Sequence, residues 1–361
     1  MLRGMFETIR PRALAPLCLL SVSLGFASAC SGATAGTPDA VDAGGDTASK
    51  PDAVVDASDA APPTDKNLIV EPDQGMMPFY TLISSAKHTL DMTMYELRDT
   101  VATGLLTTAA AKGVVVRVIL DQNLEMSDNT TAYNALAAGK VQVHWADPSY
   151  AATHQKTITV DGTTSAIMTV NFVSEDYPTS RDFALLTTSS ADVAAIEKTF
   201  DADFTNTAIT PPVGTNLVWS PTNSQSSLLG IIGGAKSSLL IENEEMSDQV
   251  IVQALVMAAS QGVDVKVAMT ASKEWDTSFS ALTVAGAHVV TYSKNASLYI
   301  HAKVIVADYG KSTATAFLGS ENFSNASLTE NRELGVITSD PGVMAVLDAT
   351  LASDYAGGTP Y

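Results

Sequence analysis

The chain has 361 residues, of which 46% are hydrophobic, and it carries 39 Asp and Glu against 20 Lys and Arg. This length and composition allow one large hydrophobic core or two medium ones, so the chain need not be a disordered or fibrous protein. After residue 66 the chain still has 31 acidic and 15 basic side chains. Such an acidic body repels polyanions and needs local basic groups to hold a phosphate.

The first 29 residues have the order of a secretory signal peptide. Arg3, Arg10 and Arg12 precede an apolar segment from Ala13 to Ala29 that ends in small residues. We therefore predict an exported protein from which this segment is removed.

Cys30 follows directly, and the only other cysteine, Cys18, lies inside the predicted signal peptide. The residues Ala27 to Cys30 resemble a bacterial lipobox, although Ala27 stands where Leu is common. The resemblance implies lipidation of Cys30 and a lipoprotein tethered at the outer membrane or the cell surface. Ordinary cleavage, which would leave a free cysteine on a secreted protein, is the alternative.

Residues 30–66 contain scarcely a large side chain and consist mainly of Ala, Asp, Gly, Pro, Ser and Thr. A segment of this kind buries too little apolar surface to offset its ordering entropy. We predict a flexible linker between the lipid anchor and the folded body.

The folded part is predicted to be an internal duplication. Leu68 to Pro72 matches Leu217 to Pro221 at an offset of 149 residues, and later matches keep offsets of 147 to 151 residues. The predicted halves are residues 67–211 and 212–361. We expect a monomer that forms an internal pseudo-dimer.

Each half alternates between strands and helices. In the first half we predict strands at Thr89 to Tyr95, Val114 to Leu120, Lys140 to Trp145, Thr157 to Val160 and Ala166 to Asn171, with a helix at Thr100 to Lys112. In the second half we predict strands at Ser238 to Asn243, Val263 to Met269, His288 to Tyr292, Val304 to Ala307 and Thr315 to Gly319, with a helix at Val250 to Gln261. Gly after each helix is a usual stop signal. This alternation predicts an α/β fold with a mixed, largely parallel sheet.

The candidate catalytic residues form a His-x-Lys-x4-Asp spacing that occurs once in each half. The two copies are His154, Lys156 and Asp161, and His301, Lys303 and Asp308. Residues two apart on a strand share one face, so each copy places an imidazole beside an ammonium. Two facing copies could enclose a phosphodiester, with one imidazole attacking phosphorus and the other protonating the leaving alcohol. This chemistry needs no metal and no other cofactor.

Further polar residues follow each copy. Thr169 with Asn171, and Ser320 with Asn322, are predicted to bind the substrate phosphate through their hydroxyl and amide groups. Asp182 and Glu333 are predicted to accept a proton from the distal ring nitrogen of each His. Asp161 and Asp308 are expected to brace the turn after the motif more than to touch substrate.

Other carboxylates invite two interpretations. Glu96 and Glu245 occupy equal repeat positions and could line the site as supporting residues. Glu242, Glu244 and Glu245 could suggest a metal cluster, but no short ligand spacing joins them. We interpret such carboxylates as surface or helix-capping residues and predict no metal site.

The duplicated motif with its trailing Gly319-Ser320-x-Asn322 resembles the phospholipase D superfamily of phosphodiesterases, over roughly Leu68 to Tyr355. The first copy departs from the family pattern at Met168, Thr169 and Asp182. The resemblance implies two pseudo-twofold related α/β/α halves packed side by side, a phosphohistidine intermediate and no metal. It favours His154 as nucleophile and His301 as general acid, although the symmetry of the sequence leaves this open.

We therefore predict a phosphoric diester hydrolase of the phospholipase D type that acts on phospholipids at a membrane surface. A secreted, metal-independent endonuclease of the same superfamily is the first alternative, and only this alternative makes nucleic acid a partner. A phosphatidyltransferase and a non-catalytic lipoprotein that binds phosphate-bearing surfaces are the others. The headgroup preference is not fixed by the sequence.

Overall fold

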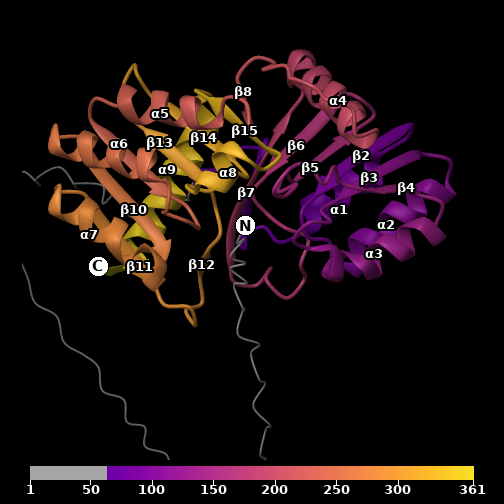
Figure 1. Ribbon diagram of the computed structural model, residues 1–361, viewed down its shortest axis with the longest axis horizontal. Helices are drawn as coiled ribbons and strands as arrows, with labels where there is room; N and C mark the ends of the chain where they lie inside the picture. The colour runs from indigo at the N-terminus through magenta and orange to yellow at the C-terminus, as the bar shows by residue number, and fades with distance from the viewer. Residues whose placement is uncertain (1–62) are drawn as a thin grey trace, which may run out of the picture. The chain divides into compact units, whose positions relative to one another are not determined.

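Two sheets with the same strand order form the framework of the molecule (Figure 1). In the computed structural model, which describes residues 63–361, the first sheet has the order β1-β7-β6-β5-β2-β3-β4. Its strands are β1 (Leu68–Glu71), β2 (Thr89–Met94), β3 (Val115–Leu120), β4 (Gln142–Trp145), β5 (Thr157–Val160), β6 (Thr164–Met168) and β7 (Ser180–Thr187). The predicted signal peptide, Cys30 and most of the predicted linker lie outside the described residues.

The second sheet repeats this order. It runs β8-β15-β14-β13-β9-β10-β11 and adds the short β16 (Thr359–Pro360) at its edge. Its other strands are β8 (Leu217–Ser220), β9 (Ser238–Glu242), β10 (Asp264–Thr270), β11 (His288–Tyr292), β13 (Val304–Ala307), β14 (Thr315–Gly319) and β15 (Glu333–Thr338). The equal order in both sheets is the structural form of the repeat in the sequence.

Both sheets are mixed, as predicted, but parallel pairs do not predominate. Along the strand orders given above, β2-β3-β4 and the equivalent β9-β10-β11 are parallel, and the remaining neighbours pair antiparallel. The reason is the short link between β5 and β6, residues 161–163, which can form a hairpin but not a parallel crossover.

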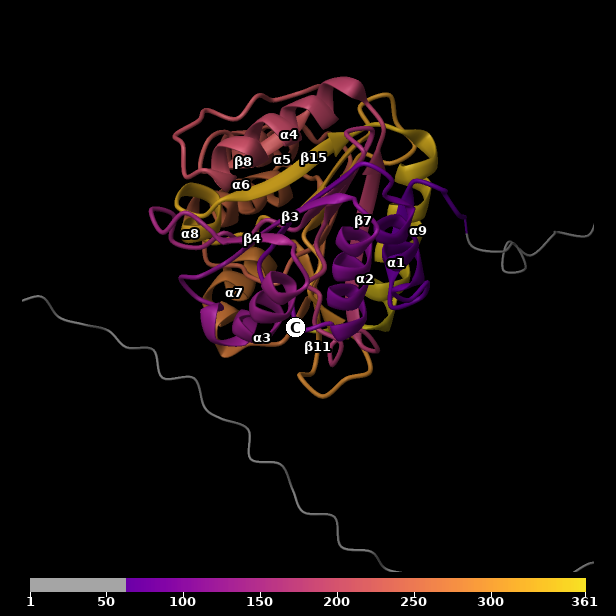
Figure 2. The ribbon, with the colours of Figure 1, turned by 90° about the vertical axis from the view of Figure 1, so that its right-hand side faces the viewer.

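Helices cover both faces of each sheet, so each half is an α/β/α sandwich (Figure 1; Figure 2 looks onto the first half). The helices of the first half are α1 (Met77–Ser85), α2 (Thr100–Ala111), α3 (Met126–Ala138) and α4 (Ser190–Phe204). Those of the second half are α5 (Ser224–Gly234), α6 (Gln249–Ser260), η2 (Lys273–Trp275), α7 (Asp276–Val284), α8 (Asn325–Thr329) and α9 (Pro341–Gly357). Among the described residues, no helix has both the length and the apolar content needed to cross a membrane.

Equivalent caps start the equivalent helices α2 and α6. The carboxylate of Asp99 accepts from the backbone N–H groups of Val101 and Ala102, and Asp248 does the same for Val250 and Ile251. An Asp at this position satisfies N–H groups that have no partner within the helix. The duplication thus extends to the local signals that start the helices.

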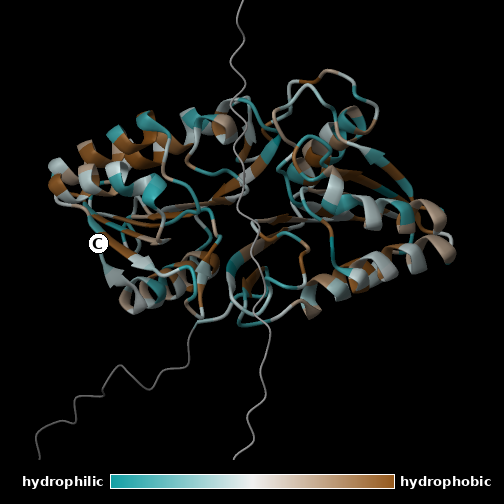
Figure 3. Cartoon of the chain, turned by 60° about the horizontal axis from the view of Figure 1, so that its bottom comes forward, coloured by the Kyte–Doolittle hydropathy of each residue, from teal (hydrophilic) through white to brown (hydrophobic). Residues whose placement is uncertain are grey.

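A separate hydrophobic core fills each half, and a third one joins the halves. The third core contains Phe183 of β7, Trp219 of β8 and Leu347 of α9, each fully buried. Figure 3 shows hydrophobic residues along the strands between the helix layers. Because contacts group the described residues into one unit, the two halves form one body.

Two buried ion pairs cross between the halves at equivalent positions. Arg181 of β7 donates to Asp354 of α9 at 2.5 Å, and Arg332 donates to Asp203 of α4 at 3.0 Å. Both arginines precede the acids Asp182 and Glu333 that were predicted to orient the histidines. The ion pairs therefore hold β7 and β15 in position where the site is formed.

Candidate active site

Each His-x-Lys motif directly precedes a strand of its own half and lies against the backbone of the opposite half. The N–H of His154 donates to the carbonyl oxygen of Arg332 at 2.9 Å, and the N–H of His301 donates to that of Arg181 at 3.3 Å. The short strand β12 (Tyr299–Ile300) pairs with β7 of the first half, and Thr153 forms the equivalent bridge with Arg332. Backbone hydrogen bonds thus fix each motif to the other half.

Each histidine donates a hydrogen bond to an acid of the opposite half. Nδ1 of His154 lies 2.7 Å from Oε2 of Glu333, and Nδ1 of His301 lies 2.7 Å from Oδ1 of Asp182. A proton held on Nδ1 leaves Nε2 as the ring atom for chemistry. The structure brings together both histidines and both predicted acids, and it pairs them crosswise.

Burial and these acids set the charge states of the pair at His154. Burial lowers the pKa of His154 to about 4, although Glu333 partly opposes the shift. Burial alone would raise the pKa of Glu333, but His154 outweighs it and the pKa of Glu333 is lowered. At neutral pH the pair is a neutral imidazole held by a carboxylate, with Nε2 able to act as a nucleophile.

Both motif lysines are fully buried. Nζ of Lys156 donates to the carbonyl oxygen of His154 at 2.7 Å, and Nζ of Lys303 donates to that of His301 at 2.5 Å. Burial and then the Lys303 ammonium lower the pKa of Lys156 to about 7. The ammonium groups of the two halves therefore lie close enough to repel each other, as an anion site requires.

The hydroxyl groups of Thr169 and Ser320 have partners other than a phosphate. Oγ1 of Thr169 donates to Asp182 at 2.5 Å, and Oγ of Ser320 accepts from the N–H of Leu334 at 3.1 Å. Both side chains are 0% exposed. Their predicted contact with substrate is replaced by support of β7 and β15, because each hydroxyl faces the neighbouring strand.

Met168 replaces a glycine of the family pattern without disturbing this arrangement. Its counterpart Gly319 faces Gly335 so closely that a Cβ on Gly319 would lie 2.4 Å from the Cα of Gly335. In the first half Met168 faces Ala184 instead. The difference is therefore one of sheet packing.

The amide side chains of Asn171 and Asn322 remain candidates for binding phosphate. The Oδ1 atom of each is buried and accepts no hydrogen bond within the described residues. Nδ2 of Asn322 lies 3.4 Å from Oε2 of Glu244. Buried amides without full protein partners are suited to a polar ligand.

Asp161 and Asp308, the last residues of the two motifs, lie at the far end of β5 and β13 from the histidines. Asp161 accepts from the N–H groups of residues 87–89, and Asp308 accepts from those of residues 236–238. Both have positive φ angles, 52° and 53°. They brace a turn, as expected from the sequence, and their inclusion among catalytic residues is corrected.

Glu244 is the residue of the site that the sequence analysis missed. Its Oε2 lies 3.0 Å from Nζ of Lys303 and 3.5 Å from Nε2 of His301. It is half-buried and is not a helix cap, and Glu242 is buried, at 1% exposure. The available signal was its place directly after a predicted interior strand, at the edge where the motifs meet.

The two predicted supporting glutamates have different surroundings, and only Glu245 has Glu244 and Lys303 as neighbours. Burial raises the pKa of both Glu96 and Glu245. Glu96 pairs with Arg98 at 3.4 Å, and one of its oxygens lies within 4.8 Å of ligand atoms on Glu125 and Asp128. Glu245 follows Glu244 in the chain, and its N–H donates to Oδ1 of Asn243.

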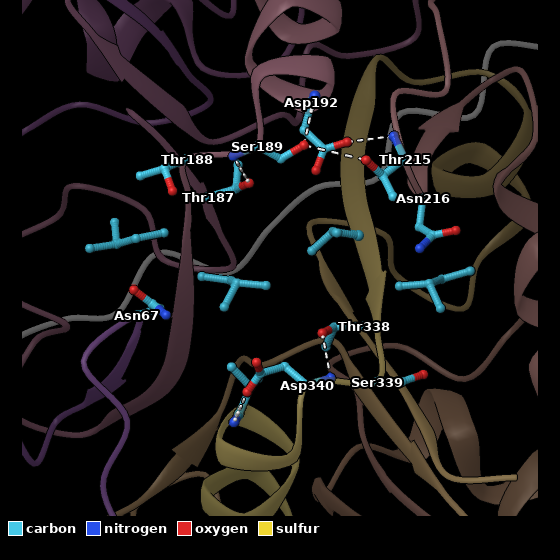
Figure 4. Close-up of a pocket in the computed structure, with 15 residues that line it drawn as sticks. Asn67, Thr187, Thr188, Ser189, Asp192, Thr215, Asn216, Thr338, Ser339 and Asp340 are labelled. Atoms are coloured by element: carbon cyan, nitrogen blue, oxygen red, sulfur yellow. Dashed lines mark hydrogen bonds between the residues drawn. The ribbon is translucent and has the colours of Figure 1, made fainter. Parts of the chain in front are cut away.

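A hollow between the far ends of β7 and β15 lacks such chemistry (Figure 4). It has a volume of about 320 Å³, and its acids Asp192 and Asp340 accept from the backbone N–H groups of Thr215 and Val343. No histidine or lysine lines it. The crossed histidine pairs are therefore the candidate active site.

Comparisons with known proteins point to one family. The family model described as "Cardiolipin synthase, PLD-like domain" matches residues 79–204 and 228–355, once in each half. Cardiolipin synthase A of Pseudomonas aeruginosa is 30% identical over 116 residues, which are 30% of this chain and 22% of that protein. The match thus spans about a fifth of the relative's length.

Two solved structures share the fold. Polyphosphate kinase from Porphyromonas gingivalis has a TM-score of 0.63 and 14% identity, covering 80% of this chain and 50% of that one. Phosphatidylserine synthase from Haemophilus influenzae has a TM-score of 0.62 and 9% identity, covering 82% of this chain and 88% of that one. At these identities the likeness concerns the fold alone.

Proposed function

The chain belongs to the phospholipase D-like family, and from this premise we propose that it cleaves phospholipid phosphodiesters through a phosphohistidine on His154. The family resemblance inferred from the sequence is confirmed. The substrate class, the reaction and the roles of the site residues are the proposal.

The observation that carries the proposal is the buried, neutral His154 held through Nδ1 by Glu333. Nε2 attacks phosphorus, the bond from phosphorus to the alcohol oxygen breaks, and Nε2–H of His301 gives its proton to that oxygen. His301 then takes a proton from water, the water oxygen attacks phosphorus, and His154 departs as a neutral imidazole. Two imidazoles thus complete the cycle.

The remaining polar groups bind and orient the phosphate in this proposal. Lys156, Lys303 and the amides of Asn171 and Asn322 hold the phosphate oxygens, whose charge grows in the transition state. Glu333 and Asp182 keep the two rings in the required tautomer and orientation. The proposed lipid anchor at Cys30 would hold the enzyme at a membrane surface.

A phosphatidyltransferase is the second candidate. The similarity to a cardiolipin synthase and to the fold of a phosphatidylserine synthase supports it. The chemistry differs only in the second step, where an alcohol takes the place of water at the phosphohistidine. The acidic body makes a nuclease the weaker candidate.

The test is a paired assay, run with and without EDTA. Purified protein is incubated with phosphatidylcholine vesicles, with and without added glycerol, and separately with single-stranded and plasmid DNA. We expect release of choline, formation of phosphatidic acid and intact DNA, while a phosphatidyl-alcohol product would identify a transferase. Cleaved DNA with intact lipid would contradict the proposal, as would lipid cleavage that chelation abolishes.

The matched controls are two histidine variants. His154→Ala should lose turnover, and His288→Ala, at an exposed position on β11, should retain it. Equal activity of both variants would contradict the assignment of His154.

A further inference from the structure

Beside the motif lysines the two halves of the site differ in charge at a pair of equivalent positions, Tyr95 and Glu244, which are 149 residues apart. In the first half the Tyr95 ring lies edge-on against the His154 ring, with centroids 4.6 Å apart, and Nζ of Lys156 lies 4.8 Å from its centroid. In the second half a carboxylate takes this place. The Lys156 side chain thus faces an aromatic ring, whereas the Lys303 ammonium forms an ion pair with a carboxylate.

Glu244 lies beside the ring nitrogen of His301 that protonates the leaving alcohol in the proposed reaction. Because Nδ1 of His301 is bonded to Asp182, its Nε2 is the proton donor to that alcohol, and Oε2 of Glu244 is 3.5 Å from this atom. The Glu244 side chain is 25% exposed, whereas the Lys303 side chain is 0% exposed. The carboxylate is therefore the more accessible of the two charges.

An aromatic ring accompanies the carboxylate. The Tyr299 hydroxyl donates to Oε1 of Glu244 at 2.9 Å, and the Tyr299 ring stacks beside His301 at 6.4 Å between centroids. Burial alone would raise the pKa of Glu244, but Lys303 and His301 outweigh it and lower the pKa, so the carboxylate is ionised. A carboxylate beside an aromatic face is the setting that favours an ammonium ligand.

We propose that Glu244, with Tyr299 beside it, is a specificity-determining residue that selects phosphodiesters whose leaving alcohol carries an ammonium group. This inference rests on the proposed function. The ammonium of such an alcohol pairs with Glu244 and draws the carboxylate away from Lys303. Lys303 is then able to bind the phosphate.

Other alcohols meet the opposite situation. A neutral alcohol offers Glu244 no cation, so the carboxylate stays on Lys303 and competes with the phosphate for it. An anionic alcohol, such as a nucleotide chain, is repelled by the same charge. Selection therefore acts through both the binding of the headgroup and the availability of Lys303.

The experiment compares two substrates of the same shape. One is dihexanoylphosphatidylcholine, and the other is its neutral isostere, in which carbon replaces the ammonium nitrogen. Both are used below their micelle concentrations, and phosphorus NMR follows the common product, dihexanoylphosphatidic acid. The measured quantity is the ratio of the two kcat/KM values.

The wild type should prefer the choline substrate by roughly tenfold, and Glu244→Gln should bring this ratio to about one. Asp264→Asn removes an exposed carboxylate at the start of β10 and should keep the wild-type ratio. Asp264 lies beside the first residue of β9, whereas Glu244 follows the last residue of that strand. A Glu244→Gln ratio equal to the wild-type ratio would overturn the inference. The proposed function would still stand, because both substrates would be cleaved.

Ionic strength gives a second readout that needs no variant. Added salt screens a partly exposed ion pair, so the wild-type ratio should fall as salt is raised. A wild-type ratio near one at low salt overturns the inference even if Glu244→Gln fails to fold. Failure to cleave either substrate would instead overturn the proposed function.

Discussion

Nδ1 of His154 lies 2.7 Å from Oε2 of Glu333, although 179 residues separate them in the chain. The equivalent pair, His301 and Asp182, has the same distance and crosses in the opposite direction. Neither half therefore contains a complete oriented histidine. The duplication is a functional requirement of the site as well as a feature of the fold.

The crossing predicts which acid controls which histidine. Glu333→Gln removes the charge that orients His154, so kcat/KM should fall roughly 10²- to 10⁴-fold, as when the acid of a catalytic triad is replaced by its amide. The chain has five histidines, so their ring-proton NMR signals can be assigned. Glu333→Gln should change the Nδ1–H signal of His154 and leave that of His301, and Asp182→Asn should do the reverse. A response of His301 to Glu333→Gln would contradict the crossed pairing.

The pH dependence should have limbs near two lowered pKa values. His154, with a pKa lowered to about 4 by burial, must be neutral to attack, so kcat/KM should rise as the pH passes about 4. Lys156, with a pKa lowered to about 7 by burial and Lys303, must be charged to bind phosphate, so kcat/KM should fall as the pH passes about 7. Bound phosphate raises the pKa of Lys156, and the alkaline limb of kcat should therefore lie at higher pH. An alkaline limb at the same pH in both profiles would count against this role of Lys156.

Asp308 should matter for stability and little for turnover. Its carboxylate accepts from the N–H groups of Ser237 at 2.6 Å and Ser238 at 3.0 Å, and from Oγ1 of Thr313 at 2.6 Å. Asn tolerates its positive φ angle, so Asp308→Asn removes the charge and one acceptor oxygen without backbone strain, and it should cost about 1–3 kcal/mol of unfolding free energy. In folded protein kcat should change less than about twofold. Loss of turnover without loss of stability would contradict the bracing role.

The contribution of Asp308 to the free energy of unfolding should depend on pH. Burial alone would raise its pKa, but the bonds from Thr313 and the backbone outweigh it and lower the pKa to about 2. A carboxyl whose pKa is lowered by folding stabilises the protein above its unfolded value and loses this contribution as the pH falls through the folded value. The stability difference between wild type and Asp308→Asn should therefore be full above pH 3.8 and shrink towards pH 2. Urea unfolding at several pH values measures it.

Lys156→Met should lower the activity without lowering the stability of the protein. Its ammonium is fully buried and repelled by Lys303, so removing it relieves a cost of folding. Activity should fall on the order of 10²- to 10³-fold, as for loss of one donor to a developing oxyanion. The thermal midpoint should not fall. Lys112→Met, at an exposed position after α2, is the control and should change neither quantity; near-normal activity of Lys156→Met would contradict the assignment.

The sequence was sufficient for the repeat and for the residues that carry chemistry. Strands β5, β11, β13 and β14 have the predicted bounds. Short apolar runs that end at Gly or polar residues leave little freedom in where a strand begins and ends. Helix α9 was not predicted. It packs against the sheet and buries Val343, Met344 and Leu347. Its sequence is apolar around most of the helix, so it lacks the polar face that marks a surface helix.

The crossed pairing and the role of Glu244 lay beyond the sequence. Asp182 and Glu333 follow their own motifs at similar distances, so pairing within a half and pairing across halves are equally compatible with the pattern. A carboxylate after a strand is most often solvated or a helix cap, and only the approach of Lys303 and His301 distinguishes Glu244.

The most direct test of the account is to find the covalent intermediate. The His301→Ala variant is mixed with a p-nitrophenyl phosphodiester, whose leaving group needs no general acid, and is quenched in base, where phosphohistidine is stable. Because the variant lacks the base that activates water, the intermediate should accumulate together with a burst of p-nitrophenol. The account predicts that mass spectrometry of the digested protein will locate the phosphoryl adduct on His154. An adduct on another residue, or a burst with no adduct, would contradict it.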